Sequence, residues 1–185
     1  MLKNVIDVGD RKQLFIDHRW FSNAYGVKLT VNPPAKRERV LWAERPWEAE
    51  RIGPYATVLE HQGQCRMWYR ASAGLKGGLV ANNVSTCLAI SDDGIHWQRP
   101  KTGVHNWLGN RDTNIVIPGG EEPSVMIDPN GLDEERFKAM ATVRGYMPDD
   151  PPEFFKATHL FTSPDGIHWR RSKKAVLPFR HDTQN

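Results

Sequence analysis

The sequence predicts an all-β fold made of repeated four-stranded units, as in a β-propeller, and three observations support this prediction. No stretch of the 185 residues keeps a helical period, and short β-rich runs are separated by Gly, Pro, Asn and Asp. One segment occurs twice, because Thr86–Trp97 recurs as Thr158–Trp169, 72 positions later. Each copy joins an apolar run to Ile-His-Trp through Asp-Gly, and Gly accepts the positive φ that a tight turn requires. Such a repeat indicates repeated supersecondary units.

The first 54 residues are predicted to be a lead-in to the repeated part, residues 1–54. Leu14–Ile16 and Val27–Val31 have the composition of strands. The run from Asn32 to Gly53 is predicted to be a loop, because prolines and clusters of charge interrupt every period in it.

Two blades of four strands are predicted after the lead-in. In the first, residues 55–108, the strands are Tyr55–Glu60, Arg66–Ala71, Ser85–Ile90 and Ile95–Gln98. In the second, residues 109–178, they are Pro123–Asp128, Arg136–Val143, Ala157–Thr162 and Ile167–Arg170. This alignment treats Arg66 and Arg136, 70 positions apart, as equivalent residues.

Residues 179–185 are predicted to begin a third blade. A propeller needs about four blades or more to close into a ring. The sequence is therefore interpreted as an N-terminal fragment, or a truncated product, of a longer propeller. An open sheet edge at this point would be an aggregation risk.

Composition argues against several classes of partner. The formal net charge is +3 and the basic residues are scattered, so we expect no nucleic-acid partner. Cys65 and Cys87 are too few for a disulfide framework, and no His cluster has metal-ligand spacing, so no metal site is predicted. The N-terminus has no apolar signal region, and no run approaches the roughly 18 apolar residues of a membrane span. We expect a cytoplasmic protein without a membrane partner, and the oligomeric state is left open.

Several short motifs resemble those of a known group of proteins. They are Gln13–Asp17, Pro46–Glu48, Arg66–Tyr69, Asn114–Val116, Glu135–Lys138, Asp182–Asn185 and the repeated Ser-x-Asp-Gly-Ile-His-Trp. Together they resemble bacterial proteins similar to the N-terminal propeller of glycoside hydrolase family 32, with families 43, 68 and 130 as wider kin. The resemblance implies a five-bladed propeller that hydrolyses glycosidic bonds in a carbohydrate substrate. It implies no cofactor, although some kin hold a structural Ca²⁺ in the channel.

The resemblance also implies three acids around the propeller axis, one from each of the first three innermost strands. Two carboxylates flanking the scissile bond are the general requirement for glycosidic cleavage. Glu48, Glu122 and Asp182 occur just before the predicted innermost strands and are candidate catalytic residues, with Asp182 foremost. Asp17 follows an apolar run and is a fourth candidate. The alternatives are that these loops simply carry charge and that Asp17 caps the loop after its strand.

Trp47, Arg51, Arg70 and Glu121 are the predicted substrate-binding residues. Trp47 offers an aromatic face to a sugar, and Arg51 and Glu121 accompany the predicted catalytic acids. A channel-facing Arg70 could bind a substrate carboxylate or phosphate in a bidentate manner. The alternative for Arg70 is an ion pair with a neighbouring acid.

Residues that recur in both copies of the repeat are predicted to be scaffold, because catalytic roles are seldom duplicated in each blade. Asp93 and Asp165 are expected to form the turns, and Trp97 and Trp169 to pack between blades. The predicted function is glycosidic hydrolysis by paired carboxylates at the central channel. Two rivals remain, a propeller that binds carbohydrate without cleaving it and an inactive truncated fragment.

Overall fold

The computed structural model describes residues 6–10, 13–18, 20–21, 23–74, 83–144 and 156–178. The chain divides into two compact units, Met1–Glu38 and Arg39–Asn185, and each is described by itself. Among the described residues, no helix is long and apolar enough to cross a membrane.

The described part of the first unit contains no strand, so the strands predicted at Leu14–Ile16 and Val27–Val31 are wrong. Its local contacts include a stack of the Phe15 and Phe21 rings, 5.7 Å between centroids, and a hydrogen bond from Trp20 Nε1 to the Leu14 carbonyl. An apolar run forms a strand only where a second strand takes up its backbone N–H and C=O groups. Within the described residues of this unit, no such partner is present.

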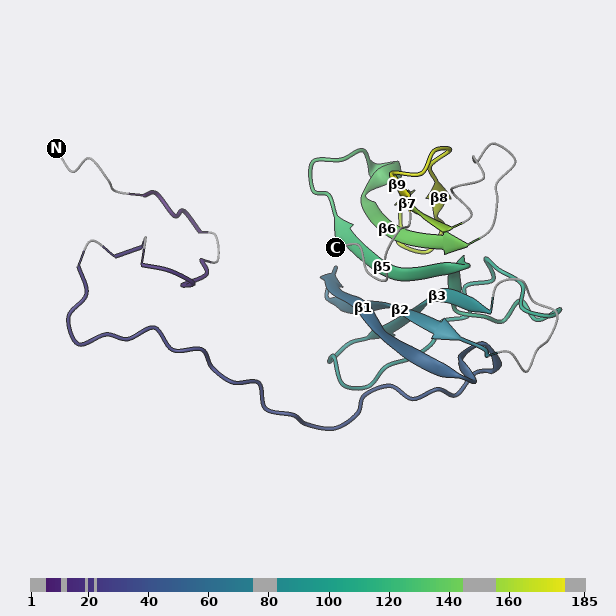
Figure 1. Ribbon diagram of the computed structural model, residues 1–185, viewed down its shortest axis with the longest axis horizontal. Coiled ribbons are helices and arrows are strands. Elements are labelled where there is room, and N and C mark those ends of the chain that lie inside the picture. Colours follow the sequence, from purple (N-terminus) through teal and green to yellow (C-terminus); the bar gives the residue numbers. More distant parts are fainter. Residues whose placement is uncertain are drawn as a thin grey trace. The chain divides into compact units, whose positions relative to one another are not determined.

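The second unit consists of two antiparallel sheets (Figure 1). The first sheet has the order β1 (Arg51–His61), β2 (Gln64–Ser72), β3 (Val84–Ser91) and β4 (Ile115–Pro118). The second sheet contains β5 (Gly120–Ile127), β6 (Phe137–Arg144), β7 (Lys156–Ser163), β8 (Arg170–Arg171) and β9 (Leu177–Pro178), and both β8 and β9 pair with β7. The short 3-10 helices η1 (Pro46–Glu48) and η3 (Asp133–Glu135) accompany them. The all-β prediction is confirmed, while the number of blades stays a prediction.

The fourth strand of the first sheet differs from the prediction. Ile95–Gln98 forms only an isolated bridge between Ile90 and Gln98, and β4 takes the outer position beside β3. Ile115, Val116 and Ile117 are all buried, so this run contributes apolar surface to the core beside β3. The first sheet therefore extends to Pro118, and the predicted blade boundary at residues 108 and 109 falls inside the loop that leads to β4.

Both copies of the repeat form the same closed turn, which we call the first Asp-Gly turn (Ser91–Trp97) and the second Asp-Gly turn (Ser163–Trp169). In the first, Ser91 Oγ accepts the N–H groups of Asp93 and Gly94. Asp93 Oδ1 accepts the next two N–H groups, at 2.8 and 2.7 Å, and Trp97 Nε1 donates to the Gly94 carbonyl. The second turn repeats each of these bonds. The predicted turn-forming role of the two Asp residues is confirmed.

The strand register fixes which residues of the two sheets are equivalent. Cys65 pairs with Ser91 in the first sheet, and Phe137 pairs with Ser163 in the second. The offset is 72 in both strands, so Arg66 corresponds to Lys138 and not to Arg136. Arg136 lies in the turn before β6, where its Nη1 donates to two carbonyls. The fully buried Phe137 explains the shift, because its ring has to face the first sheet.

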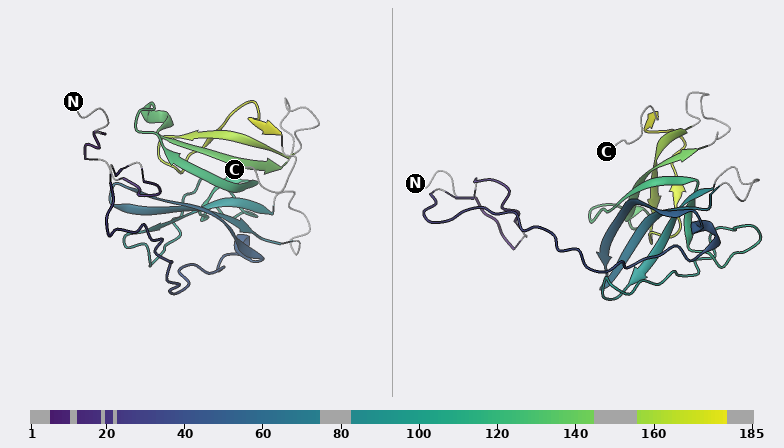
Figure 2. Two further views of the ribbon diagram at one scale, coloured as in Figure 1. Left: turned by 60° about the vertical axis from the view of Figure 1, so that its left-hand side comes forward. Right: turned by 60° about the horizontal axis from the view of Figure 1, so that its bottom comes forward.

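The two sheets pack face to face, as the three ribbon views show together (Figures 1 and 2). Trp68 and Leu88 of the first sheet pack with Val125, Phe137 and Phe161 of the second in one buried cluster. The edge strands are also joined, because Thr57 on β1 donates to the Pro123 carbonyl and accepts the Val125 N–H on β5. β5 thereby lies against β1, β2 and β3.

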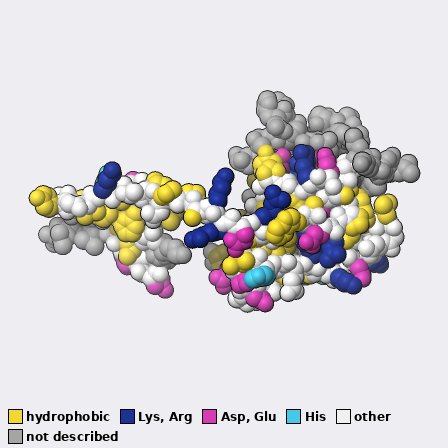
Figure 3. All heavy atoms as spheres, turned by 90° about the horizontal axis from the view of Figure 1, so that it is seen from below, with side chains coloured by type: hydrophobic (Ala, Val, Ile, Leu, Met, Phe, Trp, Pro, Cys, Tyr) yellow, Lys and Arg dark blue, Asp and Glu magenta, His cyan; other side chains and the backbone are white. Residues whose placement is uncertain are grey.

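The other face of the first sheet has its own cluster of buried residues. Tyr69, Cys87 and Ile115 are covered by Trp47 and by two partly buried side chains, Trp97 and Trp107. The second unit, seen from below in Figure 3, shows Lys and Arg interspersed with acids and apolar side chains.

Candidate functional site

Glu48 is the centre of a buried polar cluster behind the first sheet. It is fully buried at the end of η1, and Tyr69 donates its hydroxyl to Glu48 Oε1 at 2.6 Å. Arg99 binds both carboxylate oxygens, through Nε at 2.8 Å and Nη2 at 3.0 Å. The backbone N–H groups of Glu44 and Arg45 donate to Oε2. A buried carboxylate with this many donors is compensated in the way that burial of charge requires.

The cluster continues from Tyr69 to the start of β4. Asn114 Nδ2 donates to the Tyr69 hydroxyl and to the Leu88 carbonyl, while Asn114 Oδ1 accepts Trp47 Nε1, each at 2.8 Å. Burial raises the pKa of the Tyr69 phenol far above its usual value, and burial does the same for the pKa of the Cys87 thiol. Tyr69 therefore stays protonated and acts as a donor. The network ties three distant segments to one sheet face.

The burial of Glu48 and Trp47 conflicts with their predicted roles in catalysis and substrate binding. A carboxylate that cleaves a glycosidic bond has to contact the substrate, and Glu48 has no exposed surface with which to do so. Trp47 is buried as well, and its N–H is used by Asn114. In this structure both residues hold η1 and the loop before β4 against the sheet.

Two small pockets lie near these elements. One, of about 250 Å³, has a lining that includes Trp47, Asn114, the cations Arg45, Arg99 and Lys101, and the acid Asp112. The other, of about 150 Å³, lies at the first Asp-Gly turn and includes Asp93 and His96. Both are smaller than the roughly 300–1,000 Å³ of typical small-molecule sites.

A second polar cluster lies where β2 meets β5, and it unites two predicted substrate-binding residues. Arg70 Nη2 on β2 is 3.8 Å from Glu121 Oε2 on β5, and both side chains are largely buried. A Cβ at Gly53 on β1 would come within 3.1–3.3 Å of the Arg70 stem, so glycine leaves room for this arginine. Arg70 Nε is buried and has no hydrogen-bond partner in the part of the chain that the structure describes. The ion pair weighed as the alternative role of Arg70 is thus present.

Glu122 follows Glu121 at a bulge in β5. The register shifts between Glu121 and Ser124, and Glu122 has a φ of 55°. A residue other than Gly at positive φ is strained by on the order of 1 kcal/mol, and such strain is found at functional sites. Bulges also redirect side chains at sheet edges. β1 has its own register shift, between Ile52 and Ala56.

The register does not place Glu48 at the position equivalent to Glu121 or Glu122. Glu121 and Glu122 lie inside β5, whereas Glu48 precedes β1 in a 3-10 helix. Glu121 pairs with Thr142, the equivalent of Arg70, so its counterpart on β1 falls within the bulge that contains Gly53. The bulges differ in length, which is why spacing along the chain misplaced these acids.

The other predicted site residues lie apart from this cluster. Arg51 is exposed at the start of β1, and Asp17 is exposed in the first unit. Asp182 lies outside the described residues. The structure therefore brings Arg70, Glu121 and Glu122 together. Among described residues, no group of three His, Cys, Asp or Glu side chains could hold a metal. The absence of a metal site stays a prediction, as does the structural Ca²⁺ that the resemblance leaves open.

The sequence interpretation missed Tyr69, Arg99 and Asn114 as members of a polar network. They come from β2, from the chain after the first Asp-Gly turn and from the residue before β4. No spacing links such distant positions. The signal that was available is a polar residue next to a buried apolar run, as Asn114 stands beside Ile115.

No protein-family profile matches this chain, and no curated protein matches it. Thirteen solved chains do show a likeness in structure. One is a glycosyl hydrolase from Bacteroides ovatus, at 20% identity and a TM-score of 0.37, covering 63% of this chain and 29% of that one. A second is an endo-1,4-beta-xylanase from Bacteroides thetaiotaomicron, at 15% identity and a TM-score of 0.42, covering 75% and 44%.

A third comes from a study of the GH130 family of mannoside phosphorylases, which contains glycoside hydrolases that target β-1,2 mannosidic linkages in Candida mannan. Its identity is 19% and its TM-score 0.37, and the match covers 63% of this chain and 30% of that chain. This chain therefore spans less than half the length of each of these three structures. Likenesses at these values do not assign a family.

Proposed function

We propose that this protein acts on carbohydrates and hydrolyses glycosidic bonds with carboxylates at the edge where β1, β2 and β5 meet. The observation that carries the proposal is the bulge of β5, which sets Glu122 in a strained conformation beside the Arg70–Glu121 pair. Strain persists where the surrounding structure holds it, and strained residues concentrate at functional sites. The resemblance of the short motifs to glycoside hydrolases supports the same chemistry.

The roles divide according to burial. Glu122 is half-buried and is the carboxylate that contacts the sugar, whereas Glu121 is buried and its charge is compensated by Arg70. In this proposal Arg70 and Glu121 are positioning residues that hold the bulge. Arg51 is exposed at the start of β1 and offers hydrogen-bond donors to sugar hydroxyls.

A second carboxylate is required, because one acid protonates the leaving oxygen while the other attacks or activates water. Asp182 is the residue proposed for this role. Glu48 is the less suitable partner because it is fully buried and satisfied by internal donors.

Carbohydrate binding without cleavage is the second candidate function. The burial of Glu48 favours it, since the number of acids able to contact a substrate is then smaller than the motifs implied. A binding protein needs hydrogen-bond donors and aromatic faces and does not need paired carboxylates.

The test uses the full chain, a panel of oligosaccharides and aryl glycosides, and reactions with and without inorganic phosphate. Product release by the wild type is expected, and Glu122→Gln should lower kcat/KM by a factor of about 10²–10⁴, the usual contribution of a positioned acid or base. Glu134→Gln is the matched control, because Glu134 is an exposed acid in η3.

Three results separate the two functions. Loss of turnover in Glu122→Gln with Glu134→Gln unchanged supports hydrolysis. Unchanged turnover in both variants contradicts the role of Glu122. Saturable glycan binding by calorimetry with no product from the wild type overturns hydrolysis and supports the binding protein.

A further inference from the structure

Thr57, Leu59, Arg66, Trp68 and Leu88 are among the side chains of the first sheet that face the second sheet. Trp68 pairs across the strands with Thr57 and Leu88, and Arg66 pairs with Leu59. The register gives each of them an equivalent in the second sheet. These equivalents of Thr57, Leu59, Arg66, Trp68 and Leu88 are, in the same order, Ser124, Met126, Lys138, Met140 and Leu160. We call the latter group the open face.

Equivalent positions differ sharply in exposure. Trp68 is 0% exposed and Leu88 is 1% exposed, because the second sheet covers them. Met140 is 38% exposed, Leu160 36% and Met126 55%. The second sheet therefore presents apolar side chains to solvent at the positions where the first sheet is covered.

The second Asp-Gly turn shows how such a face is covered. Trp68 Nε1 donates to the Gly166 carbonyl at 2.8 Å, and Arg66 Nη1 donates to the Asp165 carbonyl at 2.7 Å. A Cβ at Gly166 would lie 2.6 Å from Trp68 Cζ2, so the turn and the indole are in close contact. Ile167 and Trp169 pack against the same buried cluster.

The first Asp-Gly turn has the same internal hydrogen bonds, but among the described residues no side chain packs against its glycine as Trp68 packs against Gly166. A Cβ at Gly94 would meet no atom of the described residues within 4 Å, and Ile95, the equivalent of the packed Ile167, is 48% exposed. Val58 on β1, the equivalent of the buried Val125, is also exposed. The chain therefore carries an uncovered turn and an uncovered face that match the two halves of its internal interface.

We propose that the open face of one copy of this chain binds the first Asp-Gly turn of a second copy, in the arrangement seen between its two sheets. The contact joins different surfaces, so the association is head to tail. The two hydrogen bonds that Trp68 and Arg66 donate to the second turn are not reproduced on the open face. Met140 has no side-chain N–H, and Lys138 is already ion-paired with Asp128. Apolar contact carries the association, which should be weak and dependent on concentration.

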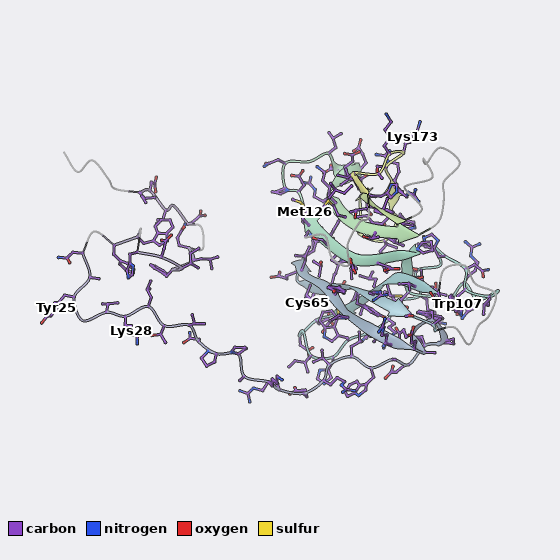
Figure 4. All side chains as sticks on the ribbon, viewed as in Figure 1. Tyr25, Lys28, Cys65, Trp107, Met126 and Lys173 are labelled. Carbon is purple, nitrogen blue, oxygen red and sulfur yellow. The ribbon has the colours of Figure 1, made fainter. Side chains whose placement is uncertain are left out.

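The charges of the two surfaces are compatible with this contact. The first turn carries Asp92 and Asp93, whereas the second has Pro164 and Asp165 at those positions. The open face carries the cation Lys138. Figure 4 shows Met126 and Cys65 at the hairpin ends of their sheets and Trp107 at the opposite end.

Sedimentation velocity across a wide concentration series tests the proposal with three variants of the full chain. Met140→Glu alters the open face, and Ile95→Glu alters the turn while leaving its backbone hydrogen bonds in place. Leu108→Glu is the control, because Leu108 is an exposed apolar residue that belongs neither to the open face nor to the first Asp-Gly turn. Thermal melting confirms that each variant folds.

The wild type and Leu108→Glu should associate, and each of the other two variants alone should bind itself at least about tenfold more weakly. An equimolar mixture of Met140→Glu and Ile95→Glu should form a dimer and stop there, because one copy then offers an intact turn and the other an intact face. A monomeric wild type at every concentration overturns the proposal. Association that Met140→Glu abolishes and Ile95→Glu leaves unchanged indicates face-to-face pairing and also overturns it.

Discussion

The two Asp-Gly turns have the same sequence pattern and the same internal hydrogen bonds, yet they lie in different surroundings. The first has Gly94 in open space, and the second has Gly166 against Trp68 of the other sheet. Both glycines have nearly the same φ, 73° and 75°. Local sequence therefore determines the shape of the turn, while a residue far away in the sequence determines how much the turn contributes to stability.

The largest expected difference concerns the residue that receives the second turn. Trp68→Ala should lower the free energy of unfolding by about 3–5 kcal/mol, because it opens a cavity and removes one of the two indole N–H donors, Trp68 and Trp169, of the Gly166 carbonyl. Met140→Ala, at the equivalent position, should cost less than about 1 kcal/mol at concentrations where the protein is monomeric. Chemical denaturation measures both values. Equal costs would show that the two positions are not in different environments.

Alanine substitutions at Gly94 and Gly166 should give a smaller difference in the free energy of unfolding, between two turns with the same internal hydrogen bonds. Each substitution places a Cβ at positive φ, which costs about 1 kcal/mol in both turns. Gly166→Ala adds overpacking against Trp68, worth about 1–3 kcal/mol. Denaturation midpoints should therefore fall further for Gly166→Ala than for Gly94→Ala. A larger effect at Gly94 would contradict the docking of the second turn.

The smallest difference concerns pH. Partial burial raises the pKa of Asp165, but hydrogen bonds from the N–H and ring of His168, the Ile167 N–H and Ser163 outweigh it and lower the pKa to about 2. An unfolded Asp has a pKa of about 3.9, so this stabilisation is complete above that pH and is lost as pH falls toward about 2. Asp165→Asn should flatten the acid side of the stability profile. An unchanged slope in urea titrations at each pH would contradict these hydrogen bonds.

Asp93 provides the comparison for that titration. Hydrogen bonds from the ring and backbone of His96 also lower the pKa of Asp93, with the same sign for stability. Its turn is exposed, so Asp93→Asn should change the profile of global unfolding less than Asp165→Asn does.

Much of the fold was predictable because local patterns determine it. The runs that became β2, β3, β6 and β7 alternate or are continuously apolar, and Asp-Gly marks both turns. β4 was not predicted as a strand, because its place depends on pairing with β3, which lies more than twenty residues earlier in the chain. The strands predicted in the first unit failed for the related reason that a strand needs a partner.

The site was less predictable than the fold. Arg70 and Glu121 were selected separately, and their contact follows from the packing of β2 against β5. The positive φ of Glu122 follows from a bulge whose length spacing alone does not reveal. Glu48 was predicted to be a channel acid from its place in the sequence alone. Its burial could not be predicted, because the network of Tyr69, Arg99 and Asn114 around it comes from three distant segments.

The most direct test of the central claim, that matching turns are free in one sheet and docked in the other, is amide hydrogen exchange followed at low protein concentration. The amides of Ile167 and His168 should exchange only with global unfolding, at least about a hundredfold more slowly than those of Ile95 and His96, which need only local opening. Equal protection of the two turns would contradict the account.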